Sequence, residues 1–114
     1  MKMVKEIRPG LFCIKVPLPE SPLKYLNSYI ICGPRRNLMI DTGFNSPVCL
    51  RAIMNGLETL KIDLADTDIF ITHFHADHFS LVPKLKTPTT RIFFNKPEAE
   101  LLSSWKGFDT ILNN

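Results

Sequence analysis

Residues 68–79 read DIFITHFHADHF, an apolar and partly β-branched run followed at once by every histidine of the chain: His73, His75 and His78. The run that ends at Thr72 predicts a short, buried β-strand. The histidines then lie where that strand ends. A packed helix or strand has no use for imidazole at this density, so the stretch indicates a functional loop that follows a buried strand.

The residue types in this loop are those that bind metals. Neutral imidazole is a strong ligand for zinc and similar divalent ions, and carboxylate suits the harder ions. Residues two apart in extended chain project the same way, so His73 and His75 can converge on one ion. A turn at Ala76 would bring Asp77 and His78 from another direction. A lone histidine is more often an ordinary polar residue. Three histidines and one aspartate within six positions, however, predict two adjacent metal sites.

The residues before this stretch predict strands. Residues 10–18 alternate apolar side chains in the manner of a β-strand. Residues 26–32 and 37–43 predict a hairpin, because two apolar runs flank the turn-forming pair Gly33 and Pro34.

A helix is expected next in the chain. Either Asn45 or Ser46 can cap its N-terminus, and Pro47 is acceptable in its first turn. Gly56 weakens such a helix without ending it. An apolar stripe at three- and four-residue spacing faces the core, and it consists of Leu50, Ile53, Met54, Leu57 and Leu60.

Three further elements are expected after the histidines. Ser80 can cap a short helix that tolerates Pro83 in its first turn. Residues 90–94 predict a strand, and Asn95 can cap a helix with Glu98 as its capping-box partner. This order predicts an α/β fold with a mixed sheet and helices on one face. The other face would then be bare, which is a liability for a monomer.

Composition narrows the class of protein. A chain of 114 residues, 45% of them hydrophobic, predicts a single globular domain. No apolar run is long enough to cross a membrane and no signal peptide is recognisable, so a cytoplasmic location is expected. The net charge of +3 is spread along the chain, which argues against nucleic acid as a partner. Cys13, Cys32 and Cys49 have aliphatic neighbours and are expected to be buried, reduced thiols.

The stretch THFHADH resembles the H-x-H-x-D-H signature of the metallo-β-lactamase-fold hydrolases. That family places the signature directly after a buried strand and carries an upstream Asp-Thr-Gly at a strand end, which is similar to 41–43 here. The resemblance covers the order of elements from Leu11 to Lys106. It implies that residues 1–114 are a single unit, the N-terminal portion of an αββα sandwich in which two sheets pack face to face with helices outside.

The resemblance also implies a role for each residue of the signature. His73 and His75 would bind the first of one or two divalent ions, with zinc the first choice and iron or manganese as alternatives. Asp77 and His78 would bind the second ion, and Asp77 would also orient a metal-bound hydroxide for hydrolysis. Asp41 would support a ligand or loop by hydrogen bonding; a plain turn residue is the alternative. The substrate would be a small molecule with an ester, thioester, lactone or similar bond.

Two departures from the family pattern qualify this expectation. The family completes its two sites with further histidines and an aspartate downstream, whereas this chain has no fourth histidine. Many relatives carry glycine where Ser80 stands. The chain alone is therefore expected to hold an incomplete site that binds metal weakly. The alternative is a non-catalytic fragment or binding module whose bare sheet face pairs with another chain, including a second copy of itself.

Overall fold

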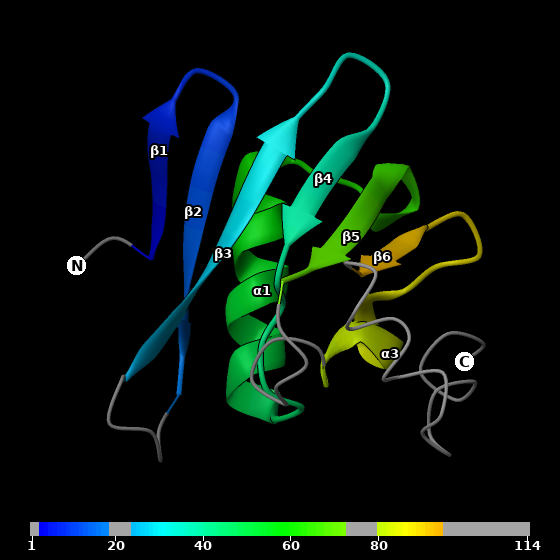
Figure 1. The fold of residues 1–114 in the computed structure, drawn as a ribbon. Coiled ribbons are helices and arrows are strands. Elements are labelled where there is room, and N and C mark those ends of the chain that lie inside the picture. The colour runs from blue at the N-terminus through cyan, green and yellow to red at the C-terminus, as the bar shows by residue number, and fades with distance from the viewer. Residues whose placement is uncertain (1–2, 19–23, 73–79, 95–114) are drawn as a thin grey trace.

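The computed structural model describes residues 3–18, 24–72 and 80–94, which form one mixed sheet with helices on one side (Figure 1). The elements are β1 (Val4–Arg8), β2 (Leu11–Pro17), β3 (Tyr25–Cys32), β4 (Asn37–Ile40), α1 (Pro47–Leu60), the 3-10 turn η1 (Leu64–Asp66), β5 (Thr67–Ile71), α3 (Val82–Leu85) and β6 (Ile92–Phe94).

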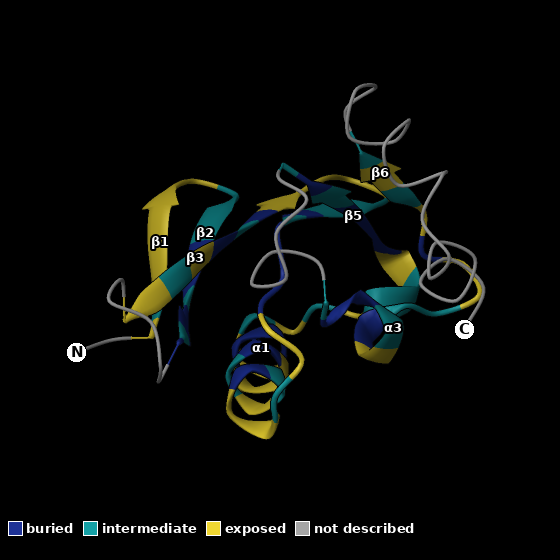
Figure 2. Cartoon of the chain, turned by 60° about the horizontal axis from the view of Figure 1, so that its bottom comes forward, coloured by how far each residue is buried: buried dark blue, intermediate teal, exposed yellow. Residues whose placement is uncertain are grey.

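The strands lie in the sheet in the order in which they occur in the chain. Neighbouring strands from β1 to β4 are antiparallel, whereas β4, β5 and β6 are parallel. The two parallel connections run through α1 and α3. Crossovers of one hand that progress in one direction place their helices on the same face, and Figure 2 shows both helices on one side of the sheet. The predicted mixed sheet with helices on one face is confirmed.

The core lies between the sheet and these helices. Alternate residues of each strand point toward α1 and α3, as the period of two requires. Helical residues at spacing three and four close the layer from the other side. The fully buried apolar side chains are Ile14, Val16, Ile30, Met39, Cys49, Ile53, Ile69, Ile71, Leu81 and Val82.

Helix α1 begins and ends with recognisable caps. Of the two predicted N-caps it is Ser46 that serves, since its Oγ accepts a hydrogen bond of 3.3 Å from the Cys49 amide. The helix ends at Leu60, and its C-cap Lys61 takes a left-handed conformation with φ of 58°. Gly56 lies inside the helix as expected, and there the helix meets the sheet. A Cβ at this position would come within 2.6 Å of Ile14 Cδ1, so glycine permits the close packing of α1 on β2.

Strand β1 was not expected from the sequence. It forms the edge of the sheet and pairs antiparallel with β2. Its sequence, VKEIR, is mostly charged, and only Val4 packs against the core while the remaining residues are exposed. Charged residues are typical of an edge strand, where they discourage pairing with other chains, and they remove the apolar alternation by which a strand is recognised.

Other expectations were wrong. Met54, placed on the core-facing stripe of α1, is 44% exposed. Ser80 does not cap the helix after it, because the N-cap of α3 is Leu81 and no side chain caps it, and the Ser80 hydroxyl bonds elsewhere. Cys32 is exposed at the end of β3, whereas Cys13 and Cys49 are buried; all three thiols are free. Burial raises the pKa of the Cys13 thiol. The helix expected from Asn95 lies outside the described residues. No helix in the described ranges is long and apolar enough to span a membrane.

The opposite face of the sheet is also largely apolar. Strand residues that alternate with the core positions point away from the helices, and Tyr25, Ile31 and Phe93 are 38%, 41% and 43% exposed. The apolar residues on this outer face are Leu11, Cys13, Tyr25, Tyr29, Ile31, Leu38, Ile40, Phe70 and Phe93. A sheet with apolar side chains on both faces is typical of one covered on both sides.

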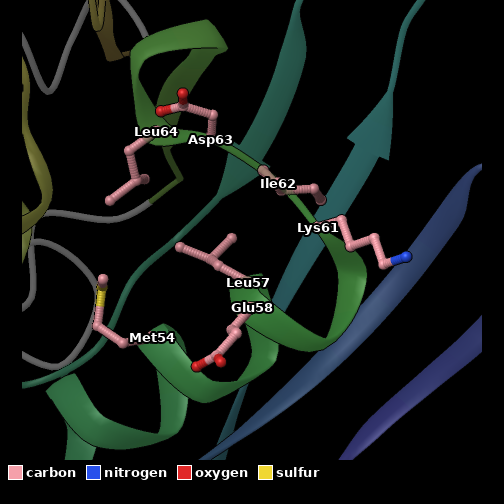
Figure 3. Close-up of a pocket in the computed structure, with 7 residues that line it drawn as sticks. All are labelled: Met54, Leu57, Glu58, Lys61, Ile62, Asp63 and Leu64. Carbon is pink, nitrogen blue, oxygen red and sulfur yellow. The ribbon is translucent and has the colours of Figure 1, made fainter.

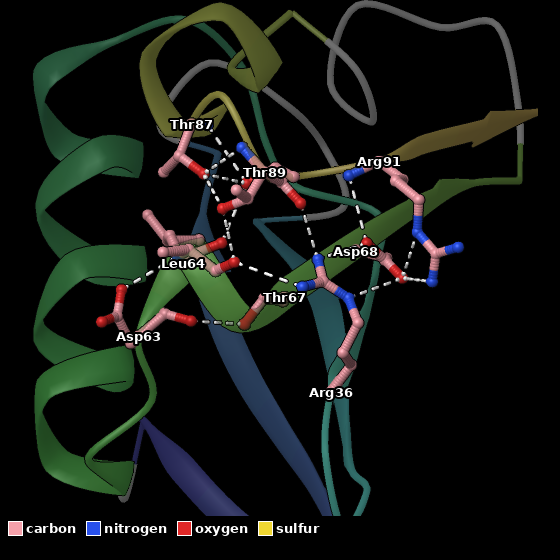
Figure 4. Close-up of polar contacts among 10 residues, drawn as sticks. Arg36, Asp63, Leu64, Thr67, Asp68, Thr87, Thr89 and Arg91 are labelled. Carbon is pink, nitrogen blue, oxygen red and sulfur yellow. Dashed lines mark hydrogen bonds and ion pairs between the residues drawn. The ribbon is translucent and has the colours of Figure 1, made fainter.

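One buried carboxylate ties the parallel strands together at their start (Figure 4). Asp68, whose side chain is 8% exposed, accepts hydrogen bonds from Arg36 Nη2 at 2.6 Å and from Arg91 Nη2 at 2.7 Å. Arg36 also donates to the carbonyls of Ala65 and Thr89. The hydrogen bonds from Arg36, followed by those from Arg91, hold the pKa of Asp68 well below its usual range.

Replacing Asp68 by Asn should lower the free energy of unfolding at pH 7 by about 1–3 kcal/mol, because two guanidinium groups lose a charged acceptor. A carboxylate whose pKa is lowered by folding stabilises the fold above its unfolded pKa of about 4, and this contribution is lost as the pH falls toward the folded value. The gap between wild type and D68N should therefore shrink below about pH 4. Urea denaturation at several pH values measures this stability difference. Glu58→Gln, at an exposed position on α1, is the control. A gap that grows on acidification would contradict this account.

Candidate metal centre

The carboxyl ends of β4 and β5 lie side by side. These strands are parallel, with Ile40 opposite Phe70, and the Asp41 amide continues the pairing with a hydrogen bond of 2.9 Å to the Phe70 carbonyl. Asp41 thus follows β4 directly, and Thr72 follows β5. Because ligands of open α/β sheets bind at the carboxyl ends of the strands, the histidine stretch leaves the sheet at the edge where a site is expected.

Asp41 binds the last described residue before the histidines. Its Oδ1 accepts a hydrogen bond of 2.8 Å from the Thr72 amide, and its Oδ2 accepts one of 2.6 Å from Thr72 Oγ1. The Asp41 carbonyl accepts a third, of 2.8 Å, from the buried Ser28 hydroxyl. Asp41 is only 6% exposed. The carboxylate therefore fixes the backbone and the hydroxyl of the residue that immediately precedes His73.

The conformation of Asp41 is itself restrictive. Its φ is 64°, a left-handed region that aspartate and asparagine tolerate better than other residues with a side chain. Asp41 is therefore both a turn residue and a hydrogen-bonding support for Thr72. Its role toward a metal stays a prediction.

The residues after Asp41 contact the chain again beyond the histidines. The Asn45 amide donates a hydrogen bond of 2.9 Å to Ser80 Oγ. The Leu81 amide donates one of 3.2 Å to the Gly43 carbonyl. Gly43 has φ of 153°, and a Cβ there would lie 3.1 Å from Val16 Cγ1. A side chain at this position would therefore disturb the hydrogen bond from the Leu81 amide to the Gly43 carbonyl.

The predicted ligands themselves lie outside the described residues. This applies to His73, His75, Asp77 and His78, and the proposed catalytic role of Asp77 likewise stays a prediction. Within the ranges that the structure describes, no group of three or more His, Cys, Asp or Glu side chains could hold a metal ion. The sequence did not single out Thr72. The signal that could have found it is Asp41, because a buried carboxylate needs hydrogen-bond donors nearby.

A pocket of about 500 Å³ lies at the far end of α1 (Figure 3). It is open and is lined by Met54, Leu57, Glu58, Lys61, Ile62, Asp63 and Leu64. The helix runs from the Asp41 end of the sheet to the opposite end, so this pocket is not part of the strand-end site.

Comparison with known proteins identifies the family to which the chain belongs. The sequence profile of the metallo-beta-lactamase superfamily matches residues 23–90, more than half of the chain. The chain belongs to the metallo-beta-lactamase superfamily. The match includes β3 to α3 and the whole histidine stretch. The described fold and the sequence therefore agree on the resemblance first indicated by the H-x-H-x-D-H pattern.

Superfamily relatives extend well beyond this chain. The lactamase-like protein aptB of Emericella nidulans is 33% identical over 81 residues, which are 68% of this chain and 26% of that protein. The atrochrysone carboxyl ACP thioesterase of Aspergillus fumigatus is 36% identical over 67 residues, 59% of this chain and 15% of that protein. The chain thus spans about a quarter of the length of aptB and less of the thioesterase.

Solved structures of the superfamily share the fold. A metallo-beta-lactamase family protein from Thermus thermophilus matches with a TM-score of 0.76 and 26% identity, covering 92% of this chain and 36% of that one. The metallo-beta-lactamase GOB-18 from Elizabethkingia meningoseptica matches with a TM-score of 0.70 and 19% identity, covering 93% and 37%. This chain therefore spans little more than a third of the length of each of these structures.

Replacing Asp41 by Ala should lower the free energy of unfolding by about 2–4 kcal/mol, because alanine both loses the hydrogen bonds to Thr72 and resists the positive φ. Asp41→Asn keeps an acceptor and tolerates this φ, so its loss should be about 1 kcal/mol. Thr72→Val removes the hydroxyl alone and should resemble D41N. Chemical denaturation of the three variants measures this order. Equal stability of D41A and D41N would contradict the role of the backbone conformation.

Proposed function

We propose that this chain carries part of the active site of a metal-dependent hydrolase that acts on an ester, thioester, lactone or similar bond of a small molecule. The observation that carries the proposal is the pair Asp41 and Thr72. It joins the ends of two parallel strands directly before the H-x-H-x-D-H stretch, in a member of the metallo-beta-lactamase superfamily.

The residues fit one or two divalent ions by their chemistry. Three imidazoles and one carboxylate in six positions suit zinc, and iron or manganese are alternatives. His73 and His75 would hold the first ion, and Asp77 and His78 the second. Both Asp41 carboxylate oxygens accept hydrogen bonds from Thr72. Asp41 would therefore act by holding the backbone before His73, as outer partners of metal ligands commonly do.

A bound divalent ion would supply an acidified water and polarise the scissile carbonyl. The chain's own contribution is orientation. Asp77, besides acting as a ligand, would accept a hydrogen bond from the attacking water at its carboxylate and so point the water's lone pair at the substrate. The imidazoles must be neutral to bind metal, so binding should weaken on acidification.

The relatives suggest which bond to test first. One of them is named as a thioesterase that acts on an acyl carrier protein, which favours a thioester among the bond types. A cytoplasmic location and the lack of a nucleic-acid partner stay predictions from the sequence.

The first test is zinc binding by the 114-residue chain. We expect weak binding that the double variant His73→Ala, His75→Ala weakens by more than about tenfold, since even the loss of outer-shell partners has effects of that size. Cys32→Ser is the matched control, because this exposed thiol could bind zinc adventitiously. Competition with a chromophoric chelator measures the affinity, and hydrolysis of a model thioester measures the activity. Zinc binding that follows Cys32 and ignores the histidines would refute the proposal.

The outer face of the sheet supports a second candidate, a binding module that pairs with another copy of the chain. A contiguous apolar face this large is rare on a monomer.

If the face pairs, Ile31→Lys should weaken self-association, because it places a charge beside Leu11 and Leu38 on the outer face. Met54→Lys is the matched control, since Met54 is 44% exposed on the helix side and Ile31 is 41% exposed. Sedimentation velocity at several concentrations measures the self-association of the wild type and of both variants. A wild-type chain that stays monomeric throughout rules out the pairing.

A further inference from the structure

The loop from Asp41 to Ser46 contacts the chain on both sides of the histidine stretch. At the near side, Asp41 accepts two hydrogen bonds from Thr72. At the far side, the Asn45 amide donates to Ser80 Oγ and the Gly43 carbonyl accepts from the Leu81 amide. One short loop thus holds the residues that come just before His73 and just after Phe79.

We propose that Ser80 is a positioning residue for the metal ligands, and this inference rests on the proposed function. We call the hydrogen bonds between Asp41 and Thr72 the near anchor, and those of Ser80 and Leu81 with the loop the far anchor. The Ser80 hydroxyl is the side-chain part of the far anchor, and the Asp41 carboxylate is that of the near anchor. A plain helix-capping role is inconsistent with the structure, because α3 has no side-chain cap. The Ser80 hydroxyl instead accepts from Asn45, 35 positions earlier in the chain.

The anchoring loop is itself well fixed. The Asp41 amide bonds to the Phe70 carbonyl, and the Asp41 carbonyl accepts from Ser28. At its other end Ser46 caps α1. Thr42 and Gly43 between them are buried. The loop is therefore continuous with both the sheet and α1, and it can hold the two anchors at a constant separation.

Fixing both ends of a segment removes much of the conformational freedom that metal binding would otherwise have to remove. Loss of the Ser80 hydroxyl deletes the hydrogen bond that the Asn45 amide donates to it. The bond between the Leu81 amide and the Gly43 carbonyl uses backbone atoms alone, so it survives the substitution and the fold should tolerate it. The expected effect is a loss of zinc affinity of about threefold to tenfold, the range of one net hydrogen bond.

The experiment compares Ser80→Ala with two matched variants in the 114-residue chain. Ser80→Thr keeps the hydroxyl and should restore wild-type affinity. Asn45→Ala removes only a side chain, because the donor is the Asn45 backbone amide, and it should leave affinity unchanged. Zinc affinity is measured by chelator competition at a temperature where all variants are folded. Hydrogen exchange of the Asn45 amide in the metal-free protein reports on the far anchor directly.

The inference is supported if S80A alone speeds exchange at Asn45 and weakens zinc binding. It is overturned if the wild type binds zinc through its histidines and S80A binds equally well, because Ser80 is then merely structural. It is also overturned if N45A weakens binding as much as S80A. A wild-type chain that binds no zinc overturns the proposed function, and this inference with it, a result distinct from the other two.

Discussion

The structure depends on one buried carboxylate at the junction of two parallel strands. Asp41 stands in a left-handed conformation at the end of β4, and from there it binds the backbone and hydroxyl that follow β5. A buried carboxylate is unfavourable without donors, so Thr72 and the strand end are held against it. The same requirement gives the chain after β5 a defined starting direction. Fold and candidate site are thus coupled through a single side chain.

A second carboxylate acts at the other end of the same strand. Asp68 forms ion pairs with Arg36, in the turn before β4, and with Arg91, the residue before β6. Strand β5 is therefore tied to its neighbours by a carboxylate at each end, with an apolar stretch between them. The two differ in partner. Charged donors hold Asp68, whose pKa is lowered, whereas the described side-chain bonds of Asp41 come from the neutral amide and hydroxyl of Thr72.

Sequence patterns predicted the elements whose causes are local. The β3–β4 hairpin, the Ser46-capped helix and the buried strand before His73 all follow from periodicity and turn residues within a few positions. Contacts between distant residues were missed. Ser80 looked like a helix cap, yet its partner is an amide 35 residues away. Cys32 has aliphatic neighbours but is exposed where β3 turns, and β1 lacks apolar alternation. The predicted metal ligands rest on a motif, and those residues lie outside the described ranges.

The two edges of the sheet and its outer face differ in what they offer to another chain. Among the described strands, β1 at one edge is charged and exposed, and β6 at the other is described over three residues. Short or charged edges resist the strand addition that leads to fibres. In the described part of the outer face, Lys15 lies over the Tyr25 ring and Arg91 over the Phe93 ring, while Ile31 is 41% exposed. If the outer face pairs as proposed, association would be face to face, which closes after two sheets, rather than edge to edge, which propagates. Mild detergent, which covers apolar faces, is for that reason a better aid to handling this protein than a denaturant.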